Sequence, residues 1–228
     1  MNAKSASQLG FAVVALAAAA WIVWRSMDHR SINLNPYQSL GGVAAEEVSR
    51  LLGNQGQVVV VLNDPGPDPD PVMDAQVAAF RGALAKVGKV AIKATELIPM
   101  DGFVRMRTGG AMPVEHFDRL KQTHGDADAV VLFLGCPMLA GDTAQQVKSW
   151  KARLVVISAA LPWYDDLVRQ GLVRLAIVPR TAAEADADSG AAPVGSTAGG
   201  PRAEFDREYR ILRADDSTSP APGDKTAR

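Results

Sequence analysis

The chain alternates between short apolar runs and stretches with helical signals. Residues 57–62 (QVVVVL) and 129–134 (AVVLFL) are continuously apolar, which is typical of strands covered on both faces. Residues 89–97 have the period-two character of a strand. Two further β-rich runs lie at 154–158 and 172–178. The pattern therefore predicts five strands.

Helical signals separate these strands. After the first strand, Asp70 is an expected N-cap and Pro71 occupies the first helical position. Apolar residues then recur at the spacing of one helix face, namely at Val77, Phe80, Leu84 and Val87. Residues 98–112 are predicted to form a glycine-containing loop. Further helices are expected at 43–52, from 113 onward, at 143–150 and at 162–170.

Strands and helices in alternation indicate an α/β fold whose parallel strands are joined by right-handed crossovers. We predict a doubly wound, mostly parallel five-stranded sheet of order 2-1-3-4-5, preceded by an N-terminal transmembrane helix. The two continuously apolar strands are expected at the centre of the sheet, because strands there are covered on both faces.

Composition divides the rest of the chain into segments. We expect a linker over residues 26–42 and the α/β domain over 43–180. Residues 181–203 are rich in Ala, Gly, Ser and Asp, so they are predicted to be a flexible linker with too little apolar surface to order itself. Alternating apolar and charged residues predict an edge strand over 204–213 that returns to the domain. The polar residues 214–228 are expected to form a disordered tail.

Residues 9–25 follow a short N-terminal tail, 1–8, and contain the uncharged run LGFAVVALAAAAWIVW. This run is slightly shorter than the ~20 apolar residues that usually span a bilayer core, and bilayer thinning accommodates such a difference. Trp21 and Trp24 lie at one end, where aromatic rings favour the membrane interface. We interpret the segment as an uncleaved transmembrane anchor. A cleaved signal peptide and a buried core helix are the alternatives.

The orientation of this segment does not follow from charge. Lys4 precedes it, and Arg25 and Arg30 follow it, so the count of positive residues is indecisive. A very short N-terminal tail before a large C-terminal domain is the usual form of a signal-anchor. We therefore expect a single-pass protein of the cell membrane with an extracytoplasmic domain, and the membrane as one of its partners.

Composition and motifs argue against several functions. The net charge of -1 offers no basic stripe, so no nucleic acid is expected as a partner. The three histidines and the single cysteine have no metal-ligand spacing, and we predict no metal and no cofactor. The chain lacks G-x-G-x-x-G, P-loop, H-E-x-x-H and G-x-S-x-G motifs. The sequence therefore favours a protein that is not an enzyme.

Ligands of open α/β sheets bind beyond the carboxyl ends of the strands. The side chains expected at this edge are the candidate ligand-binding residues Asn63, Asp64, Glu96, Cys136, Ser158 and Arg180.

These candidates have simpler interpretations beside the functional ones. Asp64 begins an acidic loop that suits Mg²⁺ or Ca²⁺, yet turn and capping chemistry explains such residues too. Glu96 is a candidate general acid together with Asp64. Cys136 is expected to be a buried structural thiol, and Arg180 is either an anion ligand or a solvated strand end.

Three stretches, VVVVLND, FRGALAKVG and ADAVVLFLG, make residues 57–178 resemble one lobe of the type 1 periplasmic binding proteins. Members of that family close two such lobes on a ligand. Here the segment after the last predicted strand is short and mostly of low complexity, so we expect one lobe. The resemblance implies the α/β fold and small-ligand binding.

We therefore predict a membrane-anchored, non-catalytic binding or scaffold protein that meets a protein partner or small ligand at the strand ends. The alternative is a one-lobed small-ligand sensor, dimeric to complete a cleft. A metal-assisted hydrolase that uses Asp64 is the least favoured hypothesis.

Overall fold

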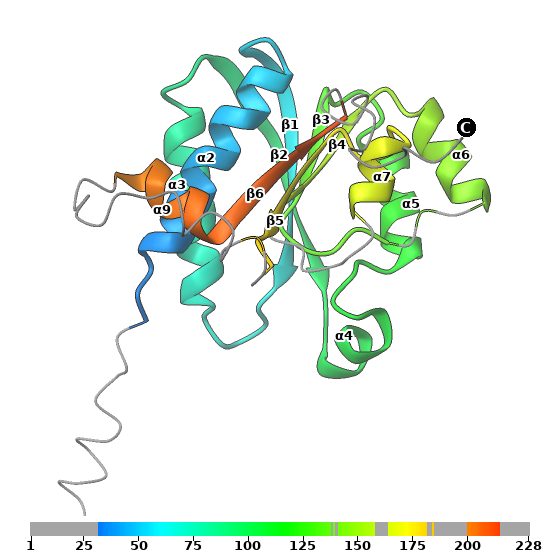
Figure 1. Cartoon of the computed structure of the whole chain (residues 1–228). Coiled ribbons are helices and arrows are strands. Elements are labelled where there is room, and N and C mark those ends of the chain that lie inside the picture. The colour runs from blue at the N-terminus through cyan, green and yellow to red at the C-terminus, as the bar shows by residue number, and fades with distance from the viewer. Residues whose placement is uncertain are drawn as a thin grey trace, which may run out of the picture. The chain divides into compact units, whose positions relative to one another are not determined.

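A six-stranded mixed sheet of order β2-β1-β3-β4-β5-β6 forms the centre of the domain (Figure 1). The computed structural model describes residues 32–137, 139, 141–157, 164–181, 184 and 200–214. The strands are β1 (Gln55–Asp64), β2 (Lys89–Pro99), β3 (Ala129–Leu132), β4 (Arg153–Ile157), β5 (Leu175–Pro179) and β6 (Tyr209–Arg213). The first five are parallel and follow the predicted order, whereas β6 pairs antiparallel with β5. The predicted α/β class is confirmed, and β6, which lies within the stretch 204–213 expected to return as an edge strand, adds a sixth strand to the five of the predicted sheet.

Helices cover both faces of this sheet (Figure 1). On one face lie α2 (Asn35–Leu51), α3 (Pro71–Leu84) and α9 (Pro201–Glu208), which share an apolar core with the sheet. The opposite face is covered by α5 (Val114–Thr123), α6 (Gly141–Ser149) and α7 (Tyr164–Arg169). The short helix α4 (Gly102–Thr108) has no buried residue and extends beyond the end of the strands on this side (Figure 1).

The continuously apolar β1 serves both cores. Val58 and Val60 belong to the core under α2 and α3, and Val59 and Val61 to the core under α5 and α7. Successive side chains of a strand point to opposite faces, so a strand covered on both sides needs apolar residues at every position. All four valines are 0% exposed, which places β1 in the interior, as the sequence predicted.

The predicted linker 26–42 is too long, because α2 begins at Asn35 with a proline in its first turn. The two glycines at 41 and 42 resemble a loop signal, but Gly41 lies where α2 crosses α3. A Cβ at Gly41 would come within 2.0 Å of the backbone oxygen of Gln76. Glycine is therefore used here for close helix packing rather than for a turn.

Two further predictions need correction. The region 98–112 is not only loop, because it contains α4. Residues 204–208, predicted as part of an edge strand, belong to α9, and only Tyr209–Arg213 form β6. Phe205 and Tyr209 are both buried and stack at 5.6 Å, so the helix and the strand share one packing site.

The predicted anchor, residues 9–25, lies outside the described residues. The predicted tail 1–8, most of the predicted linker 181–203 and the residues after Ala214 also lie outside the described residues. Within the described ranges, no helix combines the length and apolar character required to cross a bilayer.

Candidate functional site

The carboxyl ends of the parallel strands meet at one edge of the sheet, and α4 extends from it (Figure 1). We call this the carboxyl edge, formed by residues 63–70, 98–112, 133–137 and 179–180. Strands β1 and β2 leave the sheet side by side there, since Asp64 is in register with Pro99.

Asn63 and Asp64 lie at the end of β1, as predicted. The Asp64 carboxylate accepts a hydrogen bond from the Gly66 N–H at 3.0 Å, which is the chemistry of an Asx turn. Asp70 caps α3 through the Met73 N–H at 3.0 Å, as the sequence predicted. The Asn63 Oδ1 atom is buried and has no hydrogen-bond partner among the described residues. Among all the residues that the structure describes, no group of three or more His, Cys, Asp or Glu is placed to hold a metal ion.

Glu96 is not at the end of its strand, because β2 continues to Pro99. It is in register with Val61, three residues before Asp64, so Glu96 and Asp64 point to opposite faces of the sheet. The Glu96 carboxylate instead lies 2.7 Å from Nε2 of His124, at the end of α5. The hypothesis of a carboxylate pair is therefore wrong.

Cys136 follows β3 but offers no reactive thiol. It is 0% exposed, and burial raises the pKa of its thiol well above the ordinary value. Its backbone N–H donates to the Tyr164 hydroxyl at 2.9 Å, and the thiol lies 3.4 Å from the Pro137 carbonyl oxygen. Only the thiolate is a good nucleophile, so this cysteine has a structural role rather than that of a ligand at the edge.

Arg180 joins β5 to the C-terminal segment. Its backbone N–H donates to the Glu208 carbonyl at 2.9 Å, and its Nε donates to the Tyr209 carbonyl at 3.2 Å. Ser158 lies outside the described residues. Among the described members of the predicted set, Asn63 and Asp64 are neighbours at the carboxyl edge, and both residues are half-buried.

The feature that sequence reasoning missed is α4. Phe103 is 72% exposed and Met106 is 84% exposed, and no residue of this helix is buried. Arg105 and Arg107 are exposed on the same helix. We call Phe103, Arg105, Met106 and Arg107 the α4 patch.

Local signals for α4 are present in the sequence. The Asp101 carboxylate caps the helix through the Val104 N–H at 2.7 Å, and Gly109 ends it in the left-handed conformation at φ 63°. Phe103 and Met106 are three residues apart, which places them on one helical face. An N-cap and a C-terminal glycine around apolar residues at this spacing would have identified the helix.

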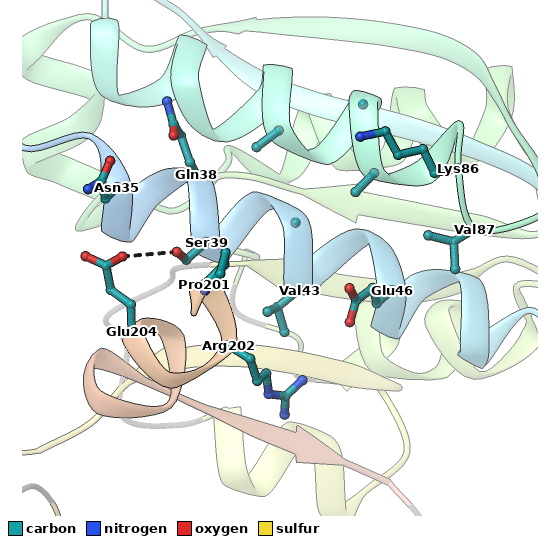
Figure 2. A pocket seen from close by; sticks show the side chains of 14 residues that line it. Asn35, Gln38, Ser39, Val43, Glu46, Lys86, Val87, Pro201, Arg202 and Glu204 are labelled. Atoms are coloured by element: carbon teal, nitrogen blue, oxygen red, sulfur yellow. Dashed lines mark hydrogen bonds between the residues drawn. The ribbon is translucent and has the colours of Figure 1, made fainter. Parts of the chain in front are cut away.

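A pocket of about 730 Å³ lies on the opposite face, between α2, α3 and α9 (Figure 2). Its long polar side chains come from all three helices and include Gln38, Glu46, Lys86 and Arg202. Ser39 of α2 donates to the Glu204 carboxylate of α9 at 3.4 Å. Helical residues and the end of α3 line this pocket, and none of the predicted site residues contributes to it.

Neither a family model nor a curated protein matches the sequence. Solved structures do match. An ABC transporter solute-binding protein from Burkholderia graminis, in complex with D-arabinose, is 16% identical with a TM-score of 0.52. The match covers 80% of this chain and 61% of that chain.

Two other solved structures agree with this match. AraP, an arabinose-binding protein from Geobacillus stearothermophilus, is 14% identical with a TM-score of 0.50, covering 79% of this chain and 62% of that one. An ABC transporter solute-binding protein from Agrobacterium vitis, bound with α-D-tagatopyranose, is 17% identical with a TM-score of 0.50, covering 80% and 58%. This chain therefore spans less than two thirds of each of these proteins. It has a periplasmic-binding-protein-like fold, and the partial coverage is consistent with one lobe.

Proposed function

We propose that this chain is a membrane-anchored, non-catalytic binding protein that presents the carboxyl edge of one periplasmic-binding-protein-like lobe to a partner. The observation that carries the proposal is the exposure of Phe103 and Met106 on α4, at 72% and 84%. Large apolar side chains that stand together on a surface, flanked by charges, mark interaction sites. Neither residue contributes to the buried core of the domain.

The arrangement of reactive groups supports a binding role over catalysis. A nucleophile requires an activating base beside it, whereas burial raises the pKa of the Cys136 thiol and so keeps it protonated. General acid-base chemistry requires groups that reach one substrate, whereas Asp64 and Glu96 point to opposite faces of the sheet.

The membrane anchor rests on the uncharged run within residues 9–25. Arg25 and Asn35, where α2 begins, are ten positions apart, and such a stretch reaches at most ~36 Å when extended. The domain would then act close to the membrane surface, on the extracytoplasmic side. A C-terminal alkaline phosphatase fusion should be active. An inactive fusion would contradict the extracytoplasmic assignment while leaving the binding role in place.

Site-specific photocrosslinking tests the binding surface. The full chain, in its membrane, carries a benzophenone amino acid at position 103 or, as the matched control, at position 119. Arg119 is exposed and belongs to α5 rather than to α4. We expect a crosslinked adduct from position 103 and none from position 119. Equal yields at the two positions, or none at position 103, would refute α4 as the binding surface.

A second candidate function is that of a one-lobed sugar sensor. It is favoured by the fold, because the similar structures were solved with D-arabinose and α-D-tagatopyranose. A ligand at a hundred times its Kd stabilises the folded state by about 2.7 kcal/mol. Pentoses and hexoses should then raise the thermal midpoint of the full chain in detergent. An unmoved midpoint across this panel would reject the sensor.

A further inference from the structure

The carboxyl edge carries opposite charges on two segments that leave adjacent strands. Arg105 and Arg107 lie on α4, which follows β2. Asp68 lies in the loop that follows β1, and Asp74 lies beside it in the first turn of α3; we call these two residues and the loop between them the acidic loop. All four side chains belong to exposed residues. None of them forms an ion pair with another described residue.

The two charged segments lie on opposite sides of the sheet edge. The loop after β1 leads to α3 on one face, whereas α4 extends beyond the edge below α5 on the other face (Figure 1). A two-fold axis that passed between them would set α4 of one molecule against the acidic loop of a second. A two-fold interface uses the same patch on both molecules, so a patch with both charges is self-complementary.

We infer that a second copy of this chain covers the α4 patch, in a two-fold dimer that joins the carboxyl edges. In this dimer Arg107 of each copy, which shares one side of α4 with Phe103 and Met106, faces the partner's acidic loop, and Phe103 and Met106 are buried between the copies. The inference rests on the proposed binding role of the carboxyl edge. Charge complementarity identifies the partner as a second copy. An anionic lipid surface does not fit, because it would repel Asp68 and Asp74.

Reciprocal charge reversal tests the dimer. One variant carries Arg105→Glu with Arg107→Glu, and the other carries Asp68→Lys with Asp74→Lys. Each variant repels itself across a two-fold interface, but a mixed pair restores both sets of contacts. Arg119→Glu is the matched control, because it reverses an exposed arginine outside the α4 patch.

The measurement is co-purification of two differently tagged full-length copies from detergent-solubilised membranes. We expect wild type and Arg119→Glu to co-purify, each charge-reversed variant to lose at least tenfold of its self-association, and the mixed pair to recover it. Self-association that persists in both variants, or a mixed pair that does not recover, would overturn the inference. Unchanged circular dichroism in every variant excludes misfolding as the cause.

Cysteine crosslinking provides an independent readout. The chain has one cysteine, Cys136, which is 0% exposed, so background labelling is low. A copy with Asp68→Cys and a copy with Met106→Cys should be joined by a short bismaleimide, whereas Arg119→Cys in place of Met106→Cys should not be. If position 103 still gives a photocrosslinked adduct while both dimer tests fail, the binding role stands and the second copy is not its partner.

Discussion

Charged side chains are partnered differently in two regions of the domain, the junction of α2 with the C-terminal segment and the α4 patch. Between α2 and the C-terminal segment, the Glu47 carboxylate, whose side chain is 1% exposed, lies 2.6 Å from Arg50 and 2.7 Å from Arg213. Arg202 approaches it to 3.7 Å. We call these four residues the Glu47 cluster. Burial of the carboxyl raises its pKa, but the hydrogen bonds from Arg213 and Arg50 outweigh burial and hold the pKa below its ordinary value of 4.5.

On α4, by contrast, the apolar and the charged side chains of the α4 patch are all exposed to solvent. The difference shows how to separate stabilising charges from binding charges in this domain. Charges whose partners lie elsewhere in the chain connect α2 to β6, and their loss should lower the free energy of unfolding. Charges and apolar groups without a described partner contribute little to folding, so their loss should affect only association.

The largest expected difference in unfolding free energy is between replacing a buried and an exposed phenylalanine. Phe117 is 0% exposed and packs edge-to-face on Trp150 at 5.8 Å, so Phe117→Ala should cost about 3–5 kcal/mol of unfolding free energy. Phe103→Ala, on α4, should change it by less than about 0.5 kcal/mol while reducing the co-purification of two differently tagged copies. Urea unfolding measures both. A large destabilisation by Phe103→Ala would remove the contrast between the buried core and the α4 patch.

Glu47→Gln tests the cluster itself. Removing one member of a buried ion pair leaves the others uncompensated, at a cost of 3–5 kcal/mol. The arginines of the cluster are partly exposed, so we expect the lower end of this range, about 3 kcal/mol. Glu46→Gln, on an exposed neighbour of the same helix, is the control and should leave the urea midpoint almost unchanged. Equal midpoints for the two variants would show that the cluster does not stabilise the fold.

The packing of α2 on α3 supplies a smaller test. Gly41→Ala places a methyl group against the Gln76 backbone and should cost about 2 kcal/mol through overpacking. Gly42→Ala is the matched control, because nothing lies within 4 Å of its Cβ position, and it should stabilise the helix by up to about 1 kcal/mol. Thermal unfolding of the pair measures the difference. A neutral Gly41→Ala would mean that the two helices do not cross closely.

The smallest effect is a pH dependence. Because the pKa of Glu47 is lower in the folded state than its ordinary value of 4.5, its contribution is fully present above that value and is lost as the pH falls through the folded pKa. Wild type should therefore lose stability on acidification below pH 4.5 more steeply than Glu47→Gln does. Parallel pH profiles of unfolding free energy would contradict this linkage.

Much of the fold was predictable because it depends on local pattern. The cap at Asp70, the apolar face of α3 and the covered strands β1 and β3 all follow from spacing along the chain. The candidate site was less predictable, because a strand end must be placed to the residue. Because β2 continues to Pro99, Glu96 lies within the strand and beside His124 rather than at the carboxyl edge, where the sequence predicted it. The sequence pattern did not predict the helix of the α4 patch. This helix has only seven residues and no buried residue, so it lacks the repeating apolar face by which a packed helix is recognised.

The sequence by itself determined the alternation of strands and helices and the two-sided burial of β1, because periodicity reports which faces of an element are covered. Only the tertiary structure decided which charges are satisfied. Glu47 and Arg213 are 166 positions apart, and they meet because β6 turns back antiparallel to β5. Local pattern does not encode pairings over such separations. The exposure of Phe103 was likewise decided by the tertiary structure, because it depends on which surfaces the rest of the chain covers.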